Sequence, residues 1–259
     1  MDENVPVEHQ LEVKEAPEIS EVGSLGTIFF EPERTFKDFK RKPRFVIAAI
    51  IIALLVTAYT LGLGYKIGEA GFRSFVAEQI DKSPRADSLT AEQKANAIDL
   101  QVTISKYTRF AIPVFVFISF VIGGLLYFLA SKAFGGTGTF LENMSVWIYA
   151  GLPPAIISMI ANFVVLALKS ADDIDLAESQ RGLLHANLSF LVDGKAHAMI
   201  ATFLSTFDFF AVWGWILAAI GLSTVNKLSK ASSWTIVMLL VLVGLGFRLI
   251  QSALSGNPS

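Results

Sequence analysis

The 259-residue sequence contains no cysteine and only three histidines. The missing cysteine excludes a disulfide scaffold, thiolate metal ligands and a cysteine nucleophile. A formal net charge of −2 gives no reason to expect nucleic acid as a partner. The sequence also lacks HExxH and GxSxG motifs, a Walker loop and a DxD-like pair inside an apolar run. With no catalytic group in view, we expect a protein that is not an enzyme and has no cofactor.

Apolar residues dominate the composition. They make up 53% of the chain, the mean hydropathy is +0.55, and charged residues contribute only 17%. A soluble domain of this length could not hide so much apolar surface. The aromatic residues are mostly phenylalanine, with 21 Phe against 5 Tyr and 4 Trp, which suits side chains that face lipid or pack between helices. The composition therefore indicates an integral membrane protein.

Five apolar segments are long enough to cross a bilayer, because a helix needs about 20 residues to span a hydrocarbon core about 30 Å thick. They cover about residues 45–65, 110–130, 144–168, 200–223 and 234–254. We therefore predict an all-α fold, in which residues 44–255 form a membrane bundle of five transmembrane helices. Residues 1–23 are acidic and lack an apolar core, so we interpret them as a disordered tail and not as a cleaved signal peptide.

Lysine and arginine near the ends of the apolar segments predict the orientation. Six basic residues precede the first segment, and the short link after the fourth carries Lys227 and Lys230 with no acid. The loops after the first and third segments are long, and the loop after the third is net acidic. We therefore expect a cytoplasmic amino terminus and an extracytoplasmic carboxyl terminus.

An amphipathic stretch with a basic end precedes the first span, within residues 24–43. Its apolar residues recur at roughly helical spacing, and Pro32 is expected to interrupt or start a helix. The pattern favours a helix that lies on the cytoplasmic membrane surface and binds it through basic side chains. The alternative is an anchor that sets the orientation, joined to a linker. The basic residues concerned are Arg34, Lys37, Lys40, Arg41, Lys42 and Arg44.

Three polar residues lie inside predicted spans, where contact with hydrocarbon is costly: Asn162, Asp208 and Arg248. A rise of about 1.5 Å per residue puts each about 8–13 Å below the outer end of its span. We therefore expect Asp208 and Arg248 to pair, with Asn162 and Tyr59 hydrogen bonding nearby. The cluster is either a proton or substrate pathway, or a structural ion pair that fixes helix register. A third interpretation is that Arg248 only extends outward to the interface.

Proline and small residues are expected to shape the spans. Pro113 falls in the first turn or so of the second span, where a proline is tolerated. Pro153 and Pro154 fall within the third span and are expected to kink or break its helix. A broken helix can line a transporter's binding site, or it can serve packing alone. Small residues in the fourth and fifth spans, such as Gly221 and Gly244, allow close approach of helices.

Two weaker patterns favour ordinary structural roles. His185, His197 and Asp193 in the second outer loop could form a zinc site, but their spacing is not diagnostic. We interpret these histidines as solvated loop residues, place His9 in the tail, and expect no metal site. The glycine-rich link at residues 134–140 invites comparison with a phosphate-binding loop, but it lacks the Lys-Ser/Thr pair of such loops. A tight cytoplasmic turn is the favoured interpretation.

The first outer loop also contains a helical pattern. Ser88 and Thr90 precede a run with apolar residues at helical spacing, which predicts a capped helix start. We expect this run to continue into the second span as one long helix.

Four features occur in an order that is similar to a known family. A proline-containing lead, Phe29-Phe-Glu-Pro-Glu-Arg-Thr-Phe36, precedes the first span. Gly135-Gly-Thr-Gly-Thr-Phe140 and Trp147-Ile-Tyr-Ala-Gly-Leu-Pro-Pro154 mark the entry to the third. Phe207-Asp-Phe-Phe-Ala-Val-Trp213, followed by Ile220-Gly-Leu-Ser223, marks the fourth. In these features and its five-span layout, the chain resembles the prokaryotic branch of the Yip family (Ypt/Rab-interacting-protein-like membrane proteins) over about residues 24–254.

The resemblance implies a role in interactions between membrane proteins. Eukaryotic members act in vesicle trafficking with prenylated Rab GTPases, but their Asp-Leu-Tyr-Gly-Pro-like tail motif is missing here. The resemblance therefore does not extend to a Rab partner. Some bacterial relatives are thought to act as accessory subunits of ABC-type exporters, although family membership does not settle function.

Two functional hypotheses remain. The first is a non-enzymatic scaffold or accessory subunit in the plasma membrane of a prokaryote, which is the inner membrane of a Gram-negative cell. Its partners would be the lipid bilayer and other membrane proteins, such as an ABC-type transporter, or a second copy of the chain. The alternative is a small transporter or channel that uses the polar cluster and the kinked third span.

Overall fold

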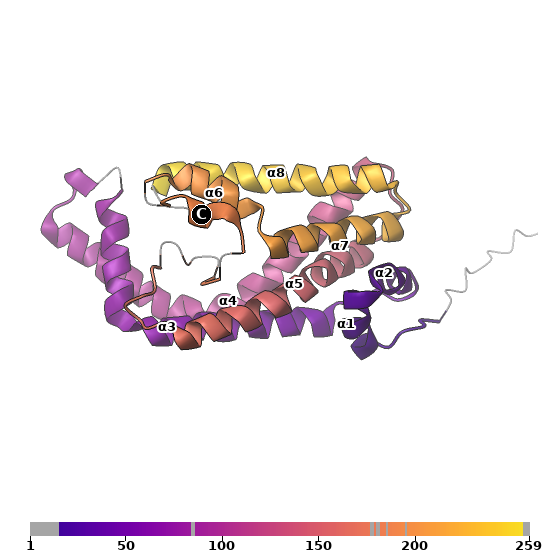
Figure 1. The fold of residues 1–259 in the computed structure, drawn as a ribbon, viewed down its shortest axis with the longest axis horizontal. Coiled ribbons are helices and arrows are strands. Elements are labelled where there is room, and N and C mark those ends of the chain that lie inside the picture. The colour runs from indigo at the N-terminus through magenta and orange to yellow at the C-terminus, as the bar shows by residue number, and fades with distance from the viewer. Residues whose placement is uncertain are drawn as a thin grey trace, which may run out of the picture.

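The computed structural model describes residues 16–83, 86–176, 179, 182–184, 186–194 and 196–255. These residues form helices and loops, with no strand among them, and the long helices run side by side along the longest axis of the molecule (Figure 1). In chain order the elements are α1 (Glu21–Phe30), α2 (Pro32–Arg41), α3 (Val46–Asp81), η1 (Ala86–Ser88), α4 (Ala91–Ala133), α5 (Phe140–Leu168), η2 (Leu188–Leu191), α6 (Ala198–Thr206), α7 (Phe209–Asn226) and α8 (Lys230–Ser255).

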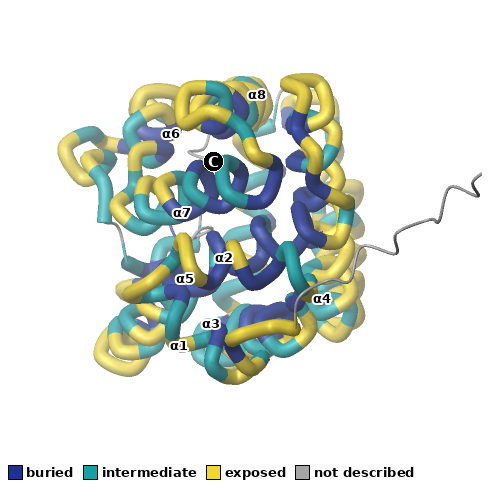
Figure 2. The backbone as a smooth tube through the Cα atoms, turned by 90° about the vertical axis from the view of Figure 1, so that its right-hand side faces the viewer, coloured by how far each residue is buried: buried dark blue, intermediate teal, exposed yellow. Residues whose placement is uncertain are grey.

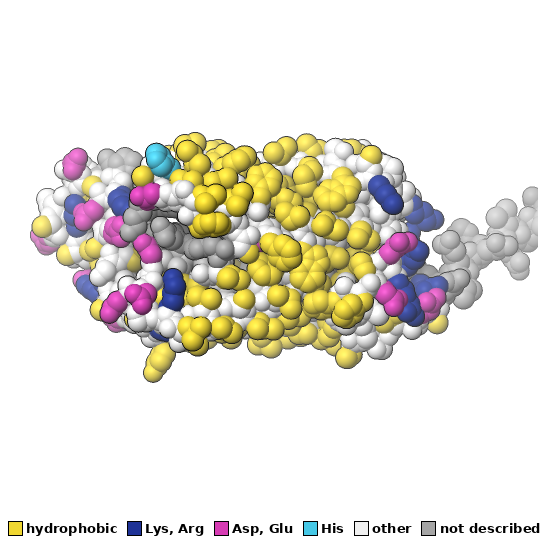
Figure 3. Space-filling view, viewed as in Figure 1, with side chains coloured by type: hydrophobic (Ala, Val, Ile, Leu, Met, Phe, Trp, Pro, Cys, Tyr) yellow, Lys and Arg dark blue, Asp and Glu magenta, His cyan; other side chains and the backbone are white. Residues whose placement is uncertain are grey.

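Five of the helices are long and apolar enough to cross a membrane: α3, α4, α5, α7 and α8. The predicted all-α bundle of five spans is therefore confirmed. Figure 3 shows a broad band of hydrophobic side chains across the middle of one face, with charged side chains gathered towards the two ends. A bilayer core about 30 Å thick would cover such a band.

The two ends of the bundle differ in what they carry. One end, here called the α2 end, carries α1, α2 and the links α4–α5 and α7–α8 (Figure 1). The opposite end, here called the hairpin end, carries the turn between α3 and α4.

Helix α2 lies across its end of the bundle and packs against α5 and α7 (Figure 2). Proline at position 32 is the first residue of α2, so it starts this helix, as one of the two predicted outcomes. Phe36 and Phe39 are fully buried, and the Phe39 ring centroid lies 4.6 Å from that of Tyr149 on α5. The apolar face of α2 thus packs into the core of the bundle and does not face a membrane surface.

Helix α5 packs against α3, α4 and α7, and small residues let these helices approach. A Cβ on Gly123 of α4 would lie only 2.0 Å from the Trp147 ring of α5. A Cβ on Gly221 of α7 would lie 2.6 Å from a methyl group of Val146. The predicted close approach at Gly221 is confirmed, whereas a Cβ on Gly244 of α8 would meet nothing within 4 Å.

The long helix predicted to begin at Thr90 is confirmed as α4. Thr90 Oγ1 accepts a hydrogen bond from the Gln93 backbone N–H at 3.2 Å, and Gln93 Oε1 accepts one from the Thr90 N–H at 2.9 Å. This reciprocal pair is a capping box. Because α4 begins so early, Pro113 lies in the interior of a continuous helix, and its predicted place in a first turn is wrong.

Helix α3 contains a sharp break at Gly68, where φ is 68° and ψ is −179°. This backbone conformation is essentially restricted to glycine. Beyond the break, α3 turns away from the bundle axis and pairs with the first part of α4 to form the hairpin (Figure 1). The ion pairs Lys94–Asp81 at 2.7 Å and Lys106–Glu69 at 2.8 Å join its two arms.

The fourth span differs from the predicted single helix over residues 200–223. The chain forms the short helix α6, leaves helical geometry at Phe207 and Asp208, and continues as α7, whose 18 residues form the crossing. Asp208 begins the new helix, because its Oδ1 accepts the Phe210 backbone N–H at 2.9 Å. One aspartate inside an apolar run hardly lowers the average hydropathy, which is why the sequence predicted no break.

Helix α5 stays helical through Pro153 and Pro154, so of the two predicted outcomes, a kink or a break, the break does not occur. Both prolines are buried between neighbouring helices. A Cβ on Gly214 of α7 would lie 3.7 Å from Pro154 Cγ, which is ordinary van der Waals contact. The structure therefore fits the packing interpretation of these prolines better than a broken helix.

Candidate functional site

A buried polar network ties the chain together at the α2 end. Asp38 is 1% exposed and forms an ion pair with Arg44, with Oδ2 and Nη1 3.4 Å apart. The same carboxylate accepts hydrogen bonds from the backbone N–H groups of Glu18 at 2.7 Å and Ile19 at 3.3 Å. Arg44 donates to the Ile19 carbonyl, and its own backbone N–H donates to Ser145 Oγ of α5 at 3.1 Å. The network therefore joins the segment before α1, helix α2 and helix α5.

The basic residues predicted to bind a membrane surface are largely engaged within the chain. Arg34 forms an ion pair with Glu31 at 2.9 Å, and Lys37 forms one with Glu33 at 2.7 Å. Arg41 forms one with Glu18, before α1, at 2.7 Å. Arg44 is buried with Asp38, so it has no access to a membrane surface. The prediction of a surface helix with a basic end rests on these charges without their acidic partners, which the sequence pattern does not show.

The remaining two basic residues, Lys40 and Lys42, are partly buried and exposed, respectively. Burial lowers the pKa of Lys40, and the positive charge of Lys227 lowers it further. The hydrogen bond from Lys37 lowers the pKa of Glu33. The α2 end thus carries charges of both signs beside one another.

A reciprocal asparagine pair joins α5 to the end of α7. Asn226 Nδ2 donates to Asn143 Oδ1 at 2.9 Å, and Asn143 Nδ2 donates to Asn226 Oδ1 at 3.1 Å. The Thr137 backbone N–H donates to the Asn226 carbonyl at 3.1 Å. Gly138 lies so close that a Cβ would be 2.4 Å from Asn226 Oδ1. The glycine-rich link is therefore a structural turn that docks onto α7.

Asn162 holds a loop segment against the bundle near the hairpin end. This side chain is 3% exposed, and its Oδ1 accepts the backbone N–H groups of Leu183 at 2.6 Å and Leu184 at 3.0 Å. Its Nδ2 donates to the Ser158 carbonyl at 2.8 Å. Gly182 has a φ of 126°, and a Cβ there would lie 2.6 Å from Asn162 Oδ1. Asn162 thus supplies the acceptor for two loop N–H groups that a helix would pair with backbone carbonyls.

Tyr59 meets the same loop through packing. It is 6% exposed and belongs to a small apolar cluster that includes Leu183. Its ring centroid lies 5.8 Å from that of Phe163. The hydroxyl is buried, and among the described residues it makes no hydrogen bond with Asn162, Asp208 or Arg248, so it does not join them in a polar cluster.

Asp208 and Arg248 do not form the predicted ion pair within the described residues. Asp208 Oδ2 accepts a hydrogen bond from Asn187 Nδ2 at 3.2 Å, while its Oδ1 caps α7. Arg248 donates to Thr206 Oγ1 at 2.5 Å and to Ser205 Oγ at 2.7 Å. The break after α6 separates them: Asp208 begins one helix, whereas Arg248 binds the carboxyl end of the previous one, where the helix dipole favours a cation.

Each polar residue of the predicted cluster therefore attaches one segment to another. Asn162 binds the backbone of Leu183 and Leu184, Asp208 binds Asn187, and Arg248 holds α6 against α8. This arrangement can fix a structure, but the described contacts contain no nucleophile with a neighbouring base.

The histidines do not form a metal site in the described part of the chain. No group of three His, Cys, Asp or Glu side chains there could hold a metal ion. His197 stands directly before α6, and Asp193 Oδ1 accepts the Ala196 backbone N–H at 3.2 Å, which shapes the preceding turn. His185 and His9, which the sequence also singled out, lie outside the described residues.

Comparison with known proteins adds an identification to this geometry. The Yip1 domain matches residues 26–250, which is most of the chain and covers four spans and most of the fifth. The chain belongs to the Yip1 family. It is 25% identical over 243 residues to the membrane protein YknW of Bacillus subtilis (strain 168), a match that covers 92% of this chain and 91% of YknW. No solved structure matches the chain.

The family resemblance predicted from the sequence is thereby confirmed. Three of the features that carried it fall where elements of this Yip1 domain join, whereas residues 147–154 and 220–223 lie inside α5 and α7. The proline-containing lead covers the end of α1 and the start of α2, and the glycine-rich segment forms the link between α4 and α5. Phe207 and Asp208 form the break between α6 and α7.

Two residues that organise this Yip1 domain were not recognised in the sequence. Asp38 stands among basic residues in the sequence, but it falls between Phe36 and Phe39 on the buried face of an amphipathic helix. Asn226 ends an apolar run beside Lys227, where polar residues are ordinary. The position of Asp38 between two phenylalanines on a helix face could have predicted its burial. Nothing in the sequence near Asn226 indicates that its partner is Asn143.

Proposed function

We propose that this Yip1-family protein is a non-enzymatic scaffold or accessory subunit of another membrane complex, in the plasma membrane of a prokaryote. An ABC-type exporter is the first class of partner to test. The α2 end would face the cytosol, in keeping with the basic residues around the first span and the α7–α8 link. The observation that carries the proposal is that polar side chains inside the bundle form hydrogen bonds with other segments of the same chain.

These polar groups bind the chain's own segments. Asn143 and Asn226 bind each other, Asn162 binds a loop backbone, and Arg248 binds hydroxyl groups of α6. Residues of a transport pathway need to exchange protein partners for a solute or a proton, at a cost that rises with every buried bond. Because these side chains already form hydrogen bonds within the chain, they support a structural role for the polar groups.

The outward faces of the bundle support interactions with other membrane helices. Helix α8 exposes Leu242, Val243 and Phe247, and Gly244 lies in the same exposed stretch. A Cβ on Gly244 would meet nothing within 4 Å in this chain, so the chain's own packing does not require this glycine. In membranes, small residues on a helix face allow a second helix to approach closely. We propose this face of α8 as the contact with the partner.

The test is affinity purification from native membranes in a mild detergent, followed by mass spectrometry of the proteins that co-purify. Gly244→Leu adds bulk to the proposed contact without an intrachain clash. We expect the wild-type chain to retain a stoichiometric membrane partner and the variant to lose it while keeping its own yield and helix content.

Gly64→Leu is the matched control. Gly64 is also an exposed helical glycine, and a Cβ there would meet nothing within 4 Å. It lies on α3, away from the proposed contact, so this variant should retain the partner. A wild-type protein that purifies alone, together with solute flux after reconstitution, would overturn the scaffold proposal in favour of a transporter.

A further inference from the structure

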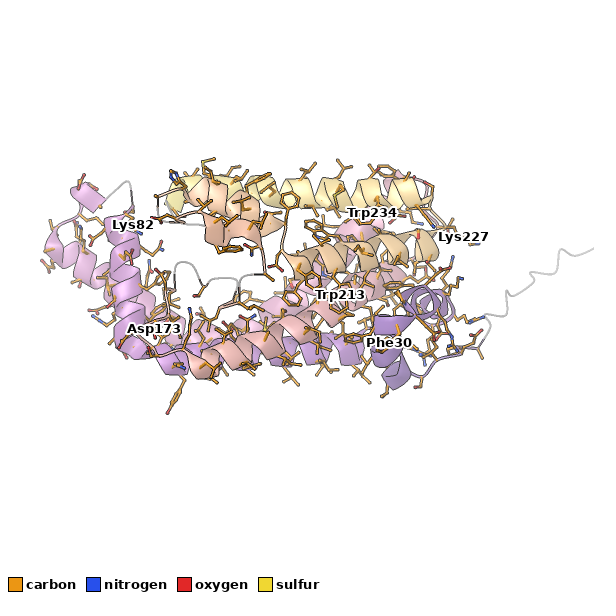
Figure 4. All side chains as sticks on the ribbon, viewed as in Figure 1. Phe30, Lys82, Asp173, Trp213, Lys227 and Trp234 are labelled. Carbon is orange, nitrogen blue, oxygen red and sulfur yellow. The ribbon has the colours of Figure 1, made fainter. Side chains whose placement is uncertain are left out.

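A groove opens at the α2 end between α2 on one side and α7 and α8 on the other. Its volume is about 1060 Å³. Figure 4 shows Lys227 at the end of α7, Trp234 on the neighbouring helix α8, and Phe30 at the end of α1. All three line the groove. We propose that this groove binds one anionic phospholipid from the leaflet that meets the α2 end.

The groove follows a single face of α7. Ile216, Ile220 and Lys227 line it at positions i, i+4 and i+11 of this helix, and Ala219, Ser223 and Thr224 line it between them. At about 1.5 Å per residue, the path from Ile216 to Lys227 is about 16 Å long. One leaflet of a hydrocarbon core about 30 Å thick has about that depth. The groove therefore extends from the headgroup level to about the middle of the membrane.

Its lining changes from charged to apolar along this path. The mouth is formed by charged residues of α2 and of the α7–α8 link, and the interior by apolar residues such as Ile216 and Ile220. Ile216 is 42% exposed and Trp234 is 40% exposed, so the apolar walls are open to an occupant. Tryptophan is favoured at the level of the headgroups. A molecule with a charged head and a hydrocarbon tail matches a groove with a charged mouth and an apolar interior.

The charge at the mouth selects an anionic head. Four cationic and two acidic side chains line the groove, which leaves an excess of two positive charges. Arg34 pairs with Glu31 at 2.9 Å, and Lys37 pairs with Glu33 at 2.7 Å. Among the described residues, no ion pair involves either of the remaining cations, which are Lys227 and Lys230. These two lysines are placed to bind a lipid phosphate.

The backbone at Lys227 supports this assignment. Lys227 has φ 55° and ψ 33°, the left-handed conformation that glycine usually provides after a helix. A lysine in this conformation carries a conformational cost that glycine would avoid. Its side chain brings a positive charge to the mouth of the groove, which a glycine could not supply.

The test uses the full-length protein in a mild detergent and native mass spectrometry. The probes are phosphatidylglycerol and phosphatidylcholine with the same acyl chains, each added at equal concentration. The test variant is Lys227→Asn with Lys230→Gln, because asparagine tolerates the left-handed conformation and both lysines are exposed. We expect the wild type to retain phosphatidylglycerol over phosphatidylcholine, and the variant to bind phosphatidylglycerol about tenfold more weakly.

Lys42→Gln with Lys132→Gln is the matched control. It removes two positive charges from the same end of the bundle but outside the groove. Its phosphatidylglycerol binding should stay within about twofold of the wild type, because surface charge away from the groove contributes only diffuse attraction. An equal loss in this control would overturn the groove as the site.

A second variant tests the apolar part of the groove. Ile216→Trp adds bulk to its exposed wall and leaves every charge in place, so we expect lipid retention to fall as in the lysine variant. Three results would overturn the proposal. These are equal retention of the two lipids by the wild type, complete displacement of lipid by millimolar inorganic phosphate, and a co-purified polypeptide in place of lipid that the lysine variant loses.

Discussion

The carboxylate of Asp38 and the guanidinium of Arg44 form a buried ion pair, with Oδ2 and Nη1 3.4 Å apart. Their side chains are only 1% and 6% exposed. Both charged groups also form hydrogen bonds with the backbone of the segment before α1. The pair therefore attaches this segment to α2 in the interior of the α2 end. Such a pair is weak as a source of stability, but removing one partner leaves the other charge buried.

We expect Asp38→Ala to destabilise the protein by about 3–5 kcal/mol, because Arg44 then remains buried without its counter-charge. The measurement is unfolding in mixed micelles as the fraction of denaturing detergent rises. Asp38→Ala combined with Arg44→Met should be more stable than Asp38→Ala alone. Glu33→Gln breaks an exposed pair with Lys37 and should leave the unfolding midpoint unchanged. A double variant as unstable as Asp38→Ala would contradict the ion-pair account.

The asparagine pair provides a second prediction. Asn143→Ala and Asn226→Ala should each cost about 1–3 kcal/mol, because each leaves a buried amide without its partner. A double-mutant cycle measured by the same unfolding assay should give a coupling of about 1 kcal/mol or more. Strictly additive losses would show that the two amides do not depend on each other.

Gly138 tests the docking of the glycine-rich link. Gly138→Ala would place a Cβ 2.4 Å from Asn226 Oδ1, and this crowding should cost about 1–3 kcal/mol. In the Asn226→Ala background the crowding atom is gone, so the same substitution should cost much less. Equal costs in the two backgrounds would mean that the link does not depend on Asn226.

Asp208 and Arg248 should behave as independent residues. Asp208→Asn should keep the cap of α7, since asparagine caps a helix about as well as aspartate. It should cost about 1 kcal/mol, because the bond that Oδ2 accepts from Asn187 Nδ2 is lost. Arg248→Gln should cost about 2 kcal/mol through its bonds to Ser205 and Thr206. If the two residues formed an ion pair, the double variant would recover stability that Arg248→Gln loses. We expect it to be no more stable than Arg248→Gln in the unfolding assay.

Gly68 and Gly64 test backbone strain, because crowding is absent at both positions. A Cβ at either position would meet nothing within 4 Å, but only Gly68 has a positive φ. Gly68→Ala should therefore cost about 1–3 kcal/mol. Gly64→Ala should be neutral or stabilising by about 0.5–1 kcal/mol, because alanine is the better helix former. Similar effects of the two substitutions on the unfolding midpoint would contradict the break in α3.

Local patterns were sufficient wherever the physical cause is local. The five apolar helices follow from run length and composition, and the start of α4 follows from the capping residues Thr90 and Gln93. Pro32 begins α2 because its fixed φ and missing N–H suit a first helical position. Each of these features depends on residues within a few positions of one another.

Features that depend on distant partners could not be predicted. Asn143 and Asn226 are 83 residues apart in the chain, and Arg44 and Ser145 are 101 apart. Asp208 shows the same limit: depth in the membrane suggested Arg248 as its partner, but the chain breaks there and Asn187 supplies the hydrogen bond. Depth alone does not determine which faces of two helices meet.

The sequence by itself determined that the chain is a five-span membrane protein of the Yip family. Hydropathy, helix capping and motif order each depend on residues that are close together in the chain. Tertiary structure alone decided that α2 packs into the bundle, that Asp38 and Arg44 are buried together, and that Asn162, Asp208 and Arg248 each bind another segment of the chain. The physical reason is that a buried polar group must find its partner wherever the packed helices place one.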